Sequence, residues 1–241
     1  MDEGGRGRFP RVLGSSPTGR RDRLLVALTF VAGCVDGISY LGLERVFTAN
    51  MTGNAVLLGL AIGQAQELQV VRSVVALLGF VAGVALGARL VDPGRDRLVW
   101  SPRITWALGV ELVLLVGFGV AWWVTGPRPA GLALAGLIAL SAMAMGVQSA
   151  VARRCAVSGV TTTYITGTLT GLMAELAALS APPLDWGRST AVLAALVAGA
   201  AVGALAQARI ALATPIVPAA LLGAVVAVAA ASFHTRTDTA A

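Results

Sequence analysis

The most informative part of this chain is the stretch FTANMTGNAVLLGLAIGQ, residues 47–64. It opens with polar residues and a glycine, and then runs apolar from Thr52 to Gly63, which makes about 18 Å of helix at about 1.5 Å per residue. A bilayer core is about 30 Å thick, so a helix that begins at Thr52 stops midway. The polar backbone before it must then lie inside protein or beside a water-filled cavity.

The sequence around this stretch is that of an integral membrane protein. Hydrophobic residues make up 56% of the 241 residues and charged residues 12%, against about 25% charged in soluble domains. We therefore expect an all-α integral membrane protein whose main partner is the lipid bilayer. The expected membrane domain covers residues 24–233. Its six predicted spans are Leu24–Leu43, Ser73–Val91, Ile104–Val124, Gly131–Val151, Ser189–Ile210 and Pro215–Phe233.

A second broken segment, Thr161–Ser180, resembles the first and indicates an internal repeat. Residues 50–54 align with residues 164–168 at an offset of 114. Asp36 aligns with Gln148 at an offset of 112, and Gly83 and Gly87 align with Gly199 and Gly203 at 116. The predicted units are residues 24–124 and 131–233, and each consists of a span, a broken segment and two further spans.

The arginines predict the topology. If both broken segments are re-entrant and the N-terminus is cytoplasmic, fourteen of the 18 arginines lie inside, against ten if both segments cross the membrane. The positive-inside rule favours the re-entrant arrangement. Thirteen lie inside if only the second segment crosses, so charge does not decide that half. Three full spans per unit invert the second unit relative to the first, which is typical of many transporters.

The two ends of the chain are expected to lie outside the membrane domain. Residues 1–23 are rich in Arg, Gly, Pro and Ser, so we expect a disordered cytoplasmic tail ahead of an uncleaved first span. Residues 234–241 form a short polar tail. The basic residues are all Arg, and this bias with abundant Ala and Gly favours a bacterial plasma membrane. The arginines lie at segment ends, which argues against nucleic-acid binding.

Asp36 is the sharpest candidate for a functional residue. An acid within a span costs several kcal/mol unless it is paired, protonated or facing water. Two interpretations remain open. Asp36 either exchanges a proton that is coupled to solute movement, or accepts hydrogen bonds from the neighbouring broken segment and fixes it in place.

The two broken segments supply the other candidates for substrate or ion binding. An Asn at a helix start caps free N–H groups, and a half-helix directs its positive dipole end toward the membrane centre. The alternative is that these residues only cap and pack the break. The candidates are Asn50, Thr52, Gly53 and Asn54 in the first unit, and Gln148, Tyr164, Thr166, Gly167 and Thr168 in the second.

Two further acids lie in apolar segments. Glu111 lies about seven residues from a basic loop, so it either extends to the interface and pairs with Arg there, or has a function inside the membrane. Glu175 lies deeper if its segment is re-entrant, and the same two interpretations apply.

Small and aromatic residues predict packing and depth. The spacing of Gly79, Gly83 and Gly87, and that of Gly199 and Gly203, lets helices approach closely. This packing is expected within the chain, with oligomer formation as the alternative. Four tryptophans are expected as interfacial anchors. They are Trp100, Trp106, Trp122 and Trp123.

Nothing in the sequence indicates an enzyme, a cofactor or a metal site. The sole histidine, His234, follows the last span, and Cys34 and Cys155 are too few for a metal or disulfide framework. Motifs of the G-x-S-x-G, H-E-x-x-H and phosphate-binding-loop types are not found.

The run VAGCVDGISYLG, residues 31–42, followed by FTANMTGN, residues 47–54, resembles the hallmark of the YoaK-type family of bacterial membrane proteins. Thr166-Gly167 and Glu111 also resemble that family, whereas the long Arg-rich tail departs from its usual short start. The resemblance covers residues 24–233 and implies a multi-span inner-membrane protein of uncharacterised activity. It supplies no catalytic residue.

We expect transport or permeation of a small solute. The alternative is a membrane sensor or assembly partner that transports nothing. A polar cavity that reaches Asp36 and Thr52 would favour transport, and apolar packing around them would favour the alternative.

Overall fold

The structure is a computed structural model that describes residues 17–91, 99–155 and 186–233. These residues form helices joined by short connections, with no strand among them, and six of the helices are long and apolar enough to cross a membrane. The protein is therefore all-α and integral to the membrane, as predicted. The helices are α1 (Pro17–Gly42), α2 (Met51–Gly63), α3 (Glu67–Val91), α4 (Pro102–Thr125), α5 (Gly131–Arg154), α7 (Trp186–Arg209) and α8 (Ile216–Phe233).

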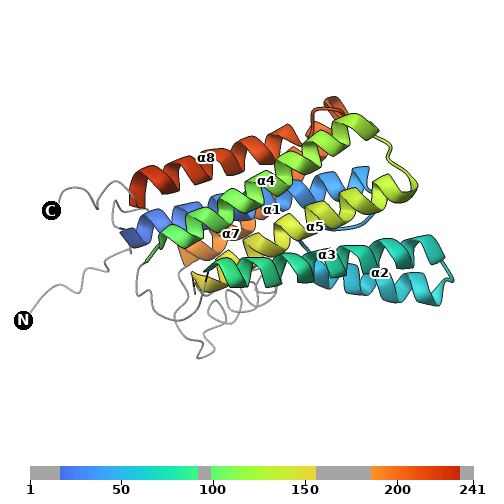
Figure 1. The fold of residues 1–241 in the computed structure, drawn as a ribbon, viewed down its shortest axis with the longest axis horizontal. Coiled ribbons are helices and arrows are strands. Elements are labelled where there is room, and N and C mark those ends of the chain that lie inside the picture. The colour runs from blue at the N-terminus through green and yellow to red at the C-terminus, as the bar shows by residue number, and fades with distance from the viewer. Residues whose placement is uncertain (1–16, 92–98, 156–185, 234–241) are drawn as a thin grey trace, which may run out of the picture.

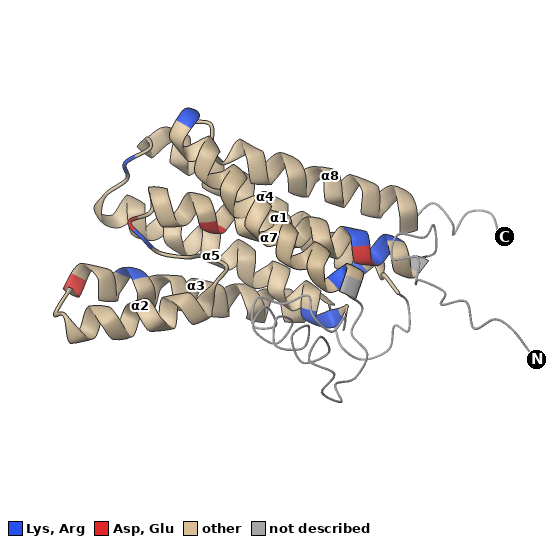
Figure 2. Cartoon of the chain, turned by 180° about the vertical axis from the view of Figure 1, so that it is seen from behind, with Lys and Arg blue, Asp and Glu red and all other residues tan. Residues whose placement is uncertain are grey.

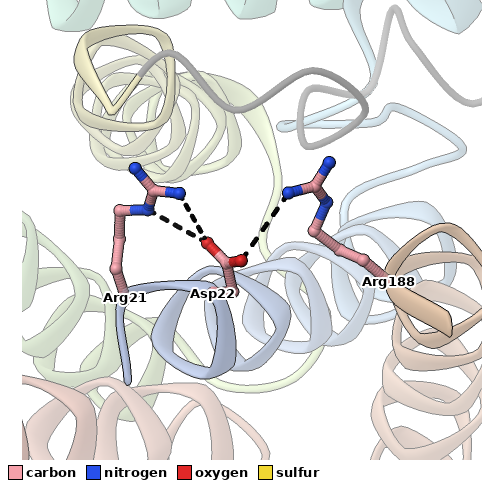
Figure 3. A network of polar contacts seen from close by, with 3 residues as sticks. All are labelled: Arg21, Asp22 and Arg188. Atoms are coloured by element: carbon pink, nitrogen blue, oxygen red, sulfur yellow. Dashed lines mark hydrogen bonds and ion pairs between the residues drawn. The ribbon is translucent and has the colours of Figure 1, made fainter. Parts of the chain in front are cut away.

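Helix α1 begins seven residues before the predicted span, so the expectation of a disordered tail is wrong for residues 17–23. Proline suits the first position of a helix, where its missing N–H would have no partner. Asp22 lies between Arg21, at 2.9 Å, and Arg188 of α7, at 3.6 Å (Figure 3). The Asp22–Arg188 pair joins the N-terminal ends of α1 and α7 and supports the part of α1 that precedes its apolar residues. Residues 1–16 lie outside the described residues.

Two helix crossings hold the bundle together, and glycines make both of them. Gly33 and Gly37 of α1 face the backbone of α7, and Gly199 and Gly203 of α7 face α1 at Phe30 and Cys34. A Cβ atom on any of these glycines would collide with a backbone carbonyl of the partner helix. Close approach of this kind gives apolar helices the van der Waals contact that lipid cannot replace.

The α3–α5 crossing has the same construction. Gly83 of α3 faces the carbonyl of Met143, and Gly146 of α5 faces the carbonyl of Phe80. A Cβ on Gly79 would stand 2.7 Å from the carbonyl oxygen of Ala139. The glycine faces named from the sequence thus serve packing within the chain, as expected.

The two crossings use positions that the predicted repeat makes equivalent. Gly83 and Gly199 differ by 116 residues, and the residues they face, Met143 and Phe30, differ by 113. The repeat itself stays a prediction, because the segment Thr161–Ser180 lies outside the described residues.

Helix α2 does not cross the membrane. Figure 1 shows α1 and α3 running in opposite directions, with α2 as a half-length helix beside α3. After α1 the chain turns back at Glu44 and Arg45, whose φ angles of 62° and 61° are left-handed. Arg72 pairs with Glu44 at 3.6 Å, and the Gln69 side chain donates to the Arg45 carbonyl at 3.4 Å, so α3 holds this turn. The first broken segment is therefore re-entrant, as predicted.

The tryptophans divide between core and surface. Trp106 and Trp123 are exposed, which suits interfacial anchors. Trp122 is fully buried and donates from its indole N–H to the carbonyl of Ala211 at 2.9 Å, and Trp100 is buried and stacks on Phe233. The expectation of anchors is therefore wrong for Trp100 and Trp122. These two residues pack against the C-terminal part of the chain, one at each end of α4.

The glycine crossings predict a contrast between two glycines of α5. Gly146→Ala places a methyl group against the Phe80 carbonyl, so we expect a loss of about 1–3 kcal/mol in the free energy of unfolding. Gly136 is exposed with nothing near its Cβ position, so Gly136→Ala should change stability by less than about 1 kcal/mol or raise it. Thermal unfolding in detergent measures both. Equal midpoints for the two variants would contradict the close crossing.

The re-entrant α2 predicts which side of the membrane a residue faces. Gln66 lies in the exposed turn between α2 and α3, and Arg20 lies in the first turn of α1. We expect Gln66→Cys, and not Arg20→Cys, to react with a membrane-impermeant maleimide in intact cells.

The native thiols should give little background in this labelling. Cys34 and Cys155 are buried, and burial raises the pKa of the Cys155 thiol to about 11, which keeps it from forming the reactive thiolate. Labelling of Arg20→Cys from outside would reverse the orientation.

Candidate functional site

The carboxylate of Asp36 lies at the centre of the α2 break. Its Oδ1 accepts hydrogen bonds from the backbone N–H groups of Thr48, Ala49 and Asn50, at 3.0, 2.7 and 3.4 Å. These three residues form the non-helical segment that leads into α2. Asp36 is six residues, or about 9 Å of helix, from the end of α1, so the break lies within the length of the first span.

This contact meets the main cost of a helix break in a membrane. Backbone N–H groups without partners in hydrocarbon each cost several kcal/mol, and a buried carboxylate is similarly costly when alone. Asp36, which is 8% exposed, offsets both costs in one arrangement. The donors are backbone groups of the broken segment and not its side chains. The geometry supports the interpretation in which Asp36 fixes the broken segment.

Asn54 and Asn50 complete the frame of the break. The Asn54 side chain, fully buried, accepts from the Phe47 N–H at 3.0 Å and donates from Nδ2 to the Phe47 carbonyl. Asn50 is the N-cap of α2, and its side-chain oxygen accepts from the Gly53 N–H at 3.1 Å. Phe47, held in this way, stacks on Tyr40 of α1 at 4.9 Å between ring centroids. The predicted cap is confirmed, and Asn54 closes a ring around residues 47–54.

One member of this cluster was missed from the sequence. Ser141 of α5 donates to the hydroxyl of Thr48 at 2.9 Å, and both residues are fully buried. This bond ties the broken segment of the first half to a helix of the second half. A single serine in an apolar span gives no signal in sequence, because its partner lies 93 residues away.

The candidates of the first unit differ in their access. Thr52 is exposed, whereas Asn50 and Gly53 are half-buried and Asp36 and Asn54 are buried. Two described surface grooves, of about 610 and 490 Å³, are lined by apolar residues except for Arg23 at the edge of the second. Neither groove is lined by Asp36 or Thr52. Neither of these two grooves therefore supplies the polar cavity at Asp36 and Thr52 that would favour transport.

The remaining candidates lie apart from this cluster. Gln148 of α5 donates from Nε2 to the carbonyl of Leu28 at 3.0 Å, so it does not hold a broken segment as Asp36 does among the described residues. Glu111 of α4 is fully buried, and the expectation that it extends to the interface or pairs with Arg is wrong. Its side chain faces the core because it follows Leu108 by one helical turn. The candidates Tyr164, Thr166, Gly167, Thr168 and Glu175 lie outside the described residues.

Within the part of the chain that the structure describes, no group of three His, Cys, Asp or Glu residues could hold a metal ion. At the break itself, the hydroxyl of Thr52 and the amide of Asn50 can form hydrogen bonds.

Comparison with known proteins agrees with this architecture. Residues 24–229 match the model of a family described as "Protein of unknown function (DUF1275)". The chain is 39% identical over 156 residues to "UPF0700 transmembrane protein YoaK" of Bacillus subtilis (strain 168), an alignment that covers 65% of this chain and 67% of that protein. No solved structure matches the chain.

The Asp36 contacts predict a specific loss of stability. Hydrogen bonds to a charged group contribute about 1.5–3 kcal/mol, so Asp36→Asn, which keeps the shape and removes the charge, should lower the free energy of unfolding by about that amount. Asp22→Asn is the matched control, because partly exposed ion pairs contribute at most about 1 kcal/mol. Thermal unfolding in detergent measures both. A wild-type midpoint for Asp36→Asn would show that the carboxylate does not hold the break.

Proposed function

Because this chain belongs to the DUF1275 family of proteins of unknown function, we propose a function from the arrangement of its helices. The protein carries a small polar solute across a bacterial plasma membrane. The observation that supports this proposal is the re-entrant α2, which begins within the length of the first span and presents the exposed Thr52 hydroxyl there. Broken helices that end inside the membrane form the solute sites of many transporters. The link to transport is an analogy of architecture.

The electrostatics of the break favour a neutral solute. The N-terminal end of α2 carries a partial positive charge from the helix dipole. Asp36 lies next to that end and already supplies a negative charge. An anionic solute would be repelled by this carboxylate, while hydroxyl or amide groups can bind Asn50 and Thr52 by hydrogen bonds.

The charges also support a cytoplasmic N-terminus. Figure 2 shows charged residues gathered toward the helix ends, with the middle of the bundle nearly free of them. Arginines concentrate at the end where α1, α4 and α7 begin, which the positive-inside rule assigns to the cytoplasm. They are Arg20, Arg21, Arg23, Arg89, Arg103, Arg153, Arg154 and Arg188, against Arg45, Arg72, Arg128 and Arg209 at the opposite end.

One observation favours the second candidate, a membrane protein that binds a partner chain. Of the described helices, α3 is the one that α2 packs against, and the opposite face of α2 is exposed. Val56, Leu60 and Ile62 lie on that side, each more than half exposed. A partner helix could cover this face. A cysteine at Val56 would then crosslink to a second chain in native membranes, whereas a transporter monomer would leave it uncrosslinked.

Transport is tested with the purified chain and one pair of variants. A library of neutral polar metabolites is screened for thermal stabilisation, and each hit is assayed for uptake into proteoliposomes. We expect Thr52→Val to weaken both responses about tenfold, the value of one good hydrogen bond. Thr125→Val, at the exposed end of α4, is the control and should behave as wild type. Transport is rejected if no metabolite stabilises the protein, or if hits are not taken up.

A further inference from the structure

Glu111 is an acid in the middle of the bundle that has no partner among the described residues. It lies nine residues into α4, about 14 Å from the start of that helix. Its side chain is 0% exposed, and neither carboxyl oxygen has a hydrogen-bond partner among the described residues. Asp36 differs in this last respect, because one of its oxygens accepts hydrogen bonds from three backbone N–H groups.

The surroundings of Glu111 are apolar. Leu108 and Leu115, one turn to either side of it, belong to a core cluster formed with residues of α1, α5 and α8, including Leu28, Met145 and Leu222. The helices packed against α4 offer no nearby charge among their described residues. Helix α8 has no titratable group, α5 has Arg153 and Arg154 in its last turn, and α3 has Glu67, Arg72 and Arg89 toward its ends.

A second unpartnered group lies on the neighbouring helix. The amide oxygen of Gln148 is buried and has no hydrogen-bond partner among the described residues, while its Nε2 is held by the Leu28 carbonyl. Across the antiparallel α4–α5 pair, Gly117 lies opposite Leu140. Because the two helices run in opposite directions, Glu111, six residues before Gly117, lies level with Gly146, six residues after Leu140. Gln148 lies two residues, or about 3 Å, further along α5.

Burial in an apolar interior restricts the charge state that the Glu111 carboxyl group can adopt. An ionised carboxylate without partners costs several kcal/mol in an apolar interior, whereas the protonated acid is neutral and carries an O–H donor. Gln148 offers an acceptor close to the same level. We propose that Glu111 is a proton-binding site in the middle of the membrane, with its O–H directed to the amide oxygen of Gln148.

Glu111 thereby takes the role of proton exchange, which the sequence suggested for Asp36. Asp36 is committed to the backbone of the broken segment, so losing its charge would release that segment. Within the described ranges Glu111 has no hydrogen-bond partner, so it can gain or lose a proton without breaking a described contact. Coupling of this proton to solute movement rests on the proposed function, but the proton site itself does not.

Infrared spectroscopy of the full chain in lipid tests the site directly. At neutral pH we expect a carbonyl band of a protonated carboxyl that shifts in deuterium oxide, is absent from Glu111→Gln and remains in Asp36→Asn. Gln148→Leu should keep the band and move it to higher frequency, because its hydrogen bond is lost. A wild-type spectrum without this band, or an unchanged band in Glu111→Gln, overturns the proposal.

Stability supplies an independent measurement. Glu111→Gln mimics the neutral acid in shape and charge, so its thermal midpoint should match wild type, whereas Asp36→Asn should be lowered. A Glu111→Gln variant that fails to fold would mean that the ionised form is required, and would also overturn the proposal. In proteoliposomes, failure of uptake by the wild type rejects transport and leaves the proton site standing on its infrared band.

Discussion

Backbone N–H groups inside a membrane have no water to bind, and this constraint governs the structure around Asp36. A chain that turns back before crossing the bilayer exposes a run of such groups at the break. One carboxylate oxygen accepts three of them, and the charge of the acid is balanced by the donors and by the start of α2. The acid and the broken helix therefore depend on each other. Asn54 and the Thr48–Ser141 bond then fix the direction in which the segment leaves α1.

The position of Asp36 is set by a packing contact on the same helix. Gly33 and Gly37 lie on either side of Asp36 in sequence and bring α1 against the backbone of α7. Rotation of α1 about its own axis would move Gly33 and Gly37 away from α7. The crossing therefore also fixes the direction in which the Asp36 carboxylate points. Helix α5, which supplies Ser141, is fixed by its own glycine crossing with α3. The polar cluster is thus held by close apolar contacts on two sides.

The sequence predicted the parts of this arrangement that depend on local pattern. Six spans follow from apolar length, the half-helix from a polar start and a short apolar run, and the Asn50 cap from residue type. The burial of Glu111 and Trp122 could not be predicted, because the face of a span that meets protein rather than lipid has no distinct hydrophobicity. The Ser141 bond and the pairing of α1 with α7 depend on tertiary contacts between distant segments. The start of α1 at Pro17 was missed because an ion pair to another helix, rather than apolar residues, supports its first turns.

The α1–α7 crossing has a consequence for how the protein is made. Helix α1 leaves the ribosome more than 140 residues before α7 begins, so its glycine face and Asp36 enter the bilayer before α7 is synthesised. Helix α3 likewise waits for α5. During synthesis α1 and α3 must therefore remain in the membrane without these two partners, or be shielded by the insertion machinery, until the second half arrives. Assembly is a late event that interlocks both halves at once, and a truncated chain that ends before α7 lacks the helix that packs most extensively on its first span.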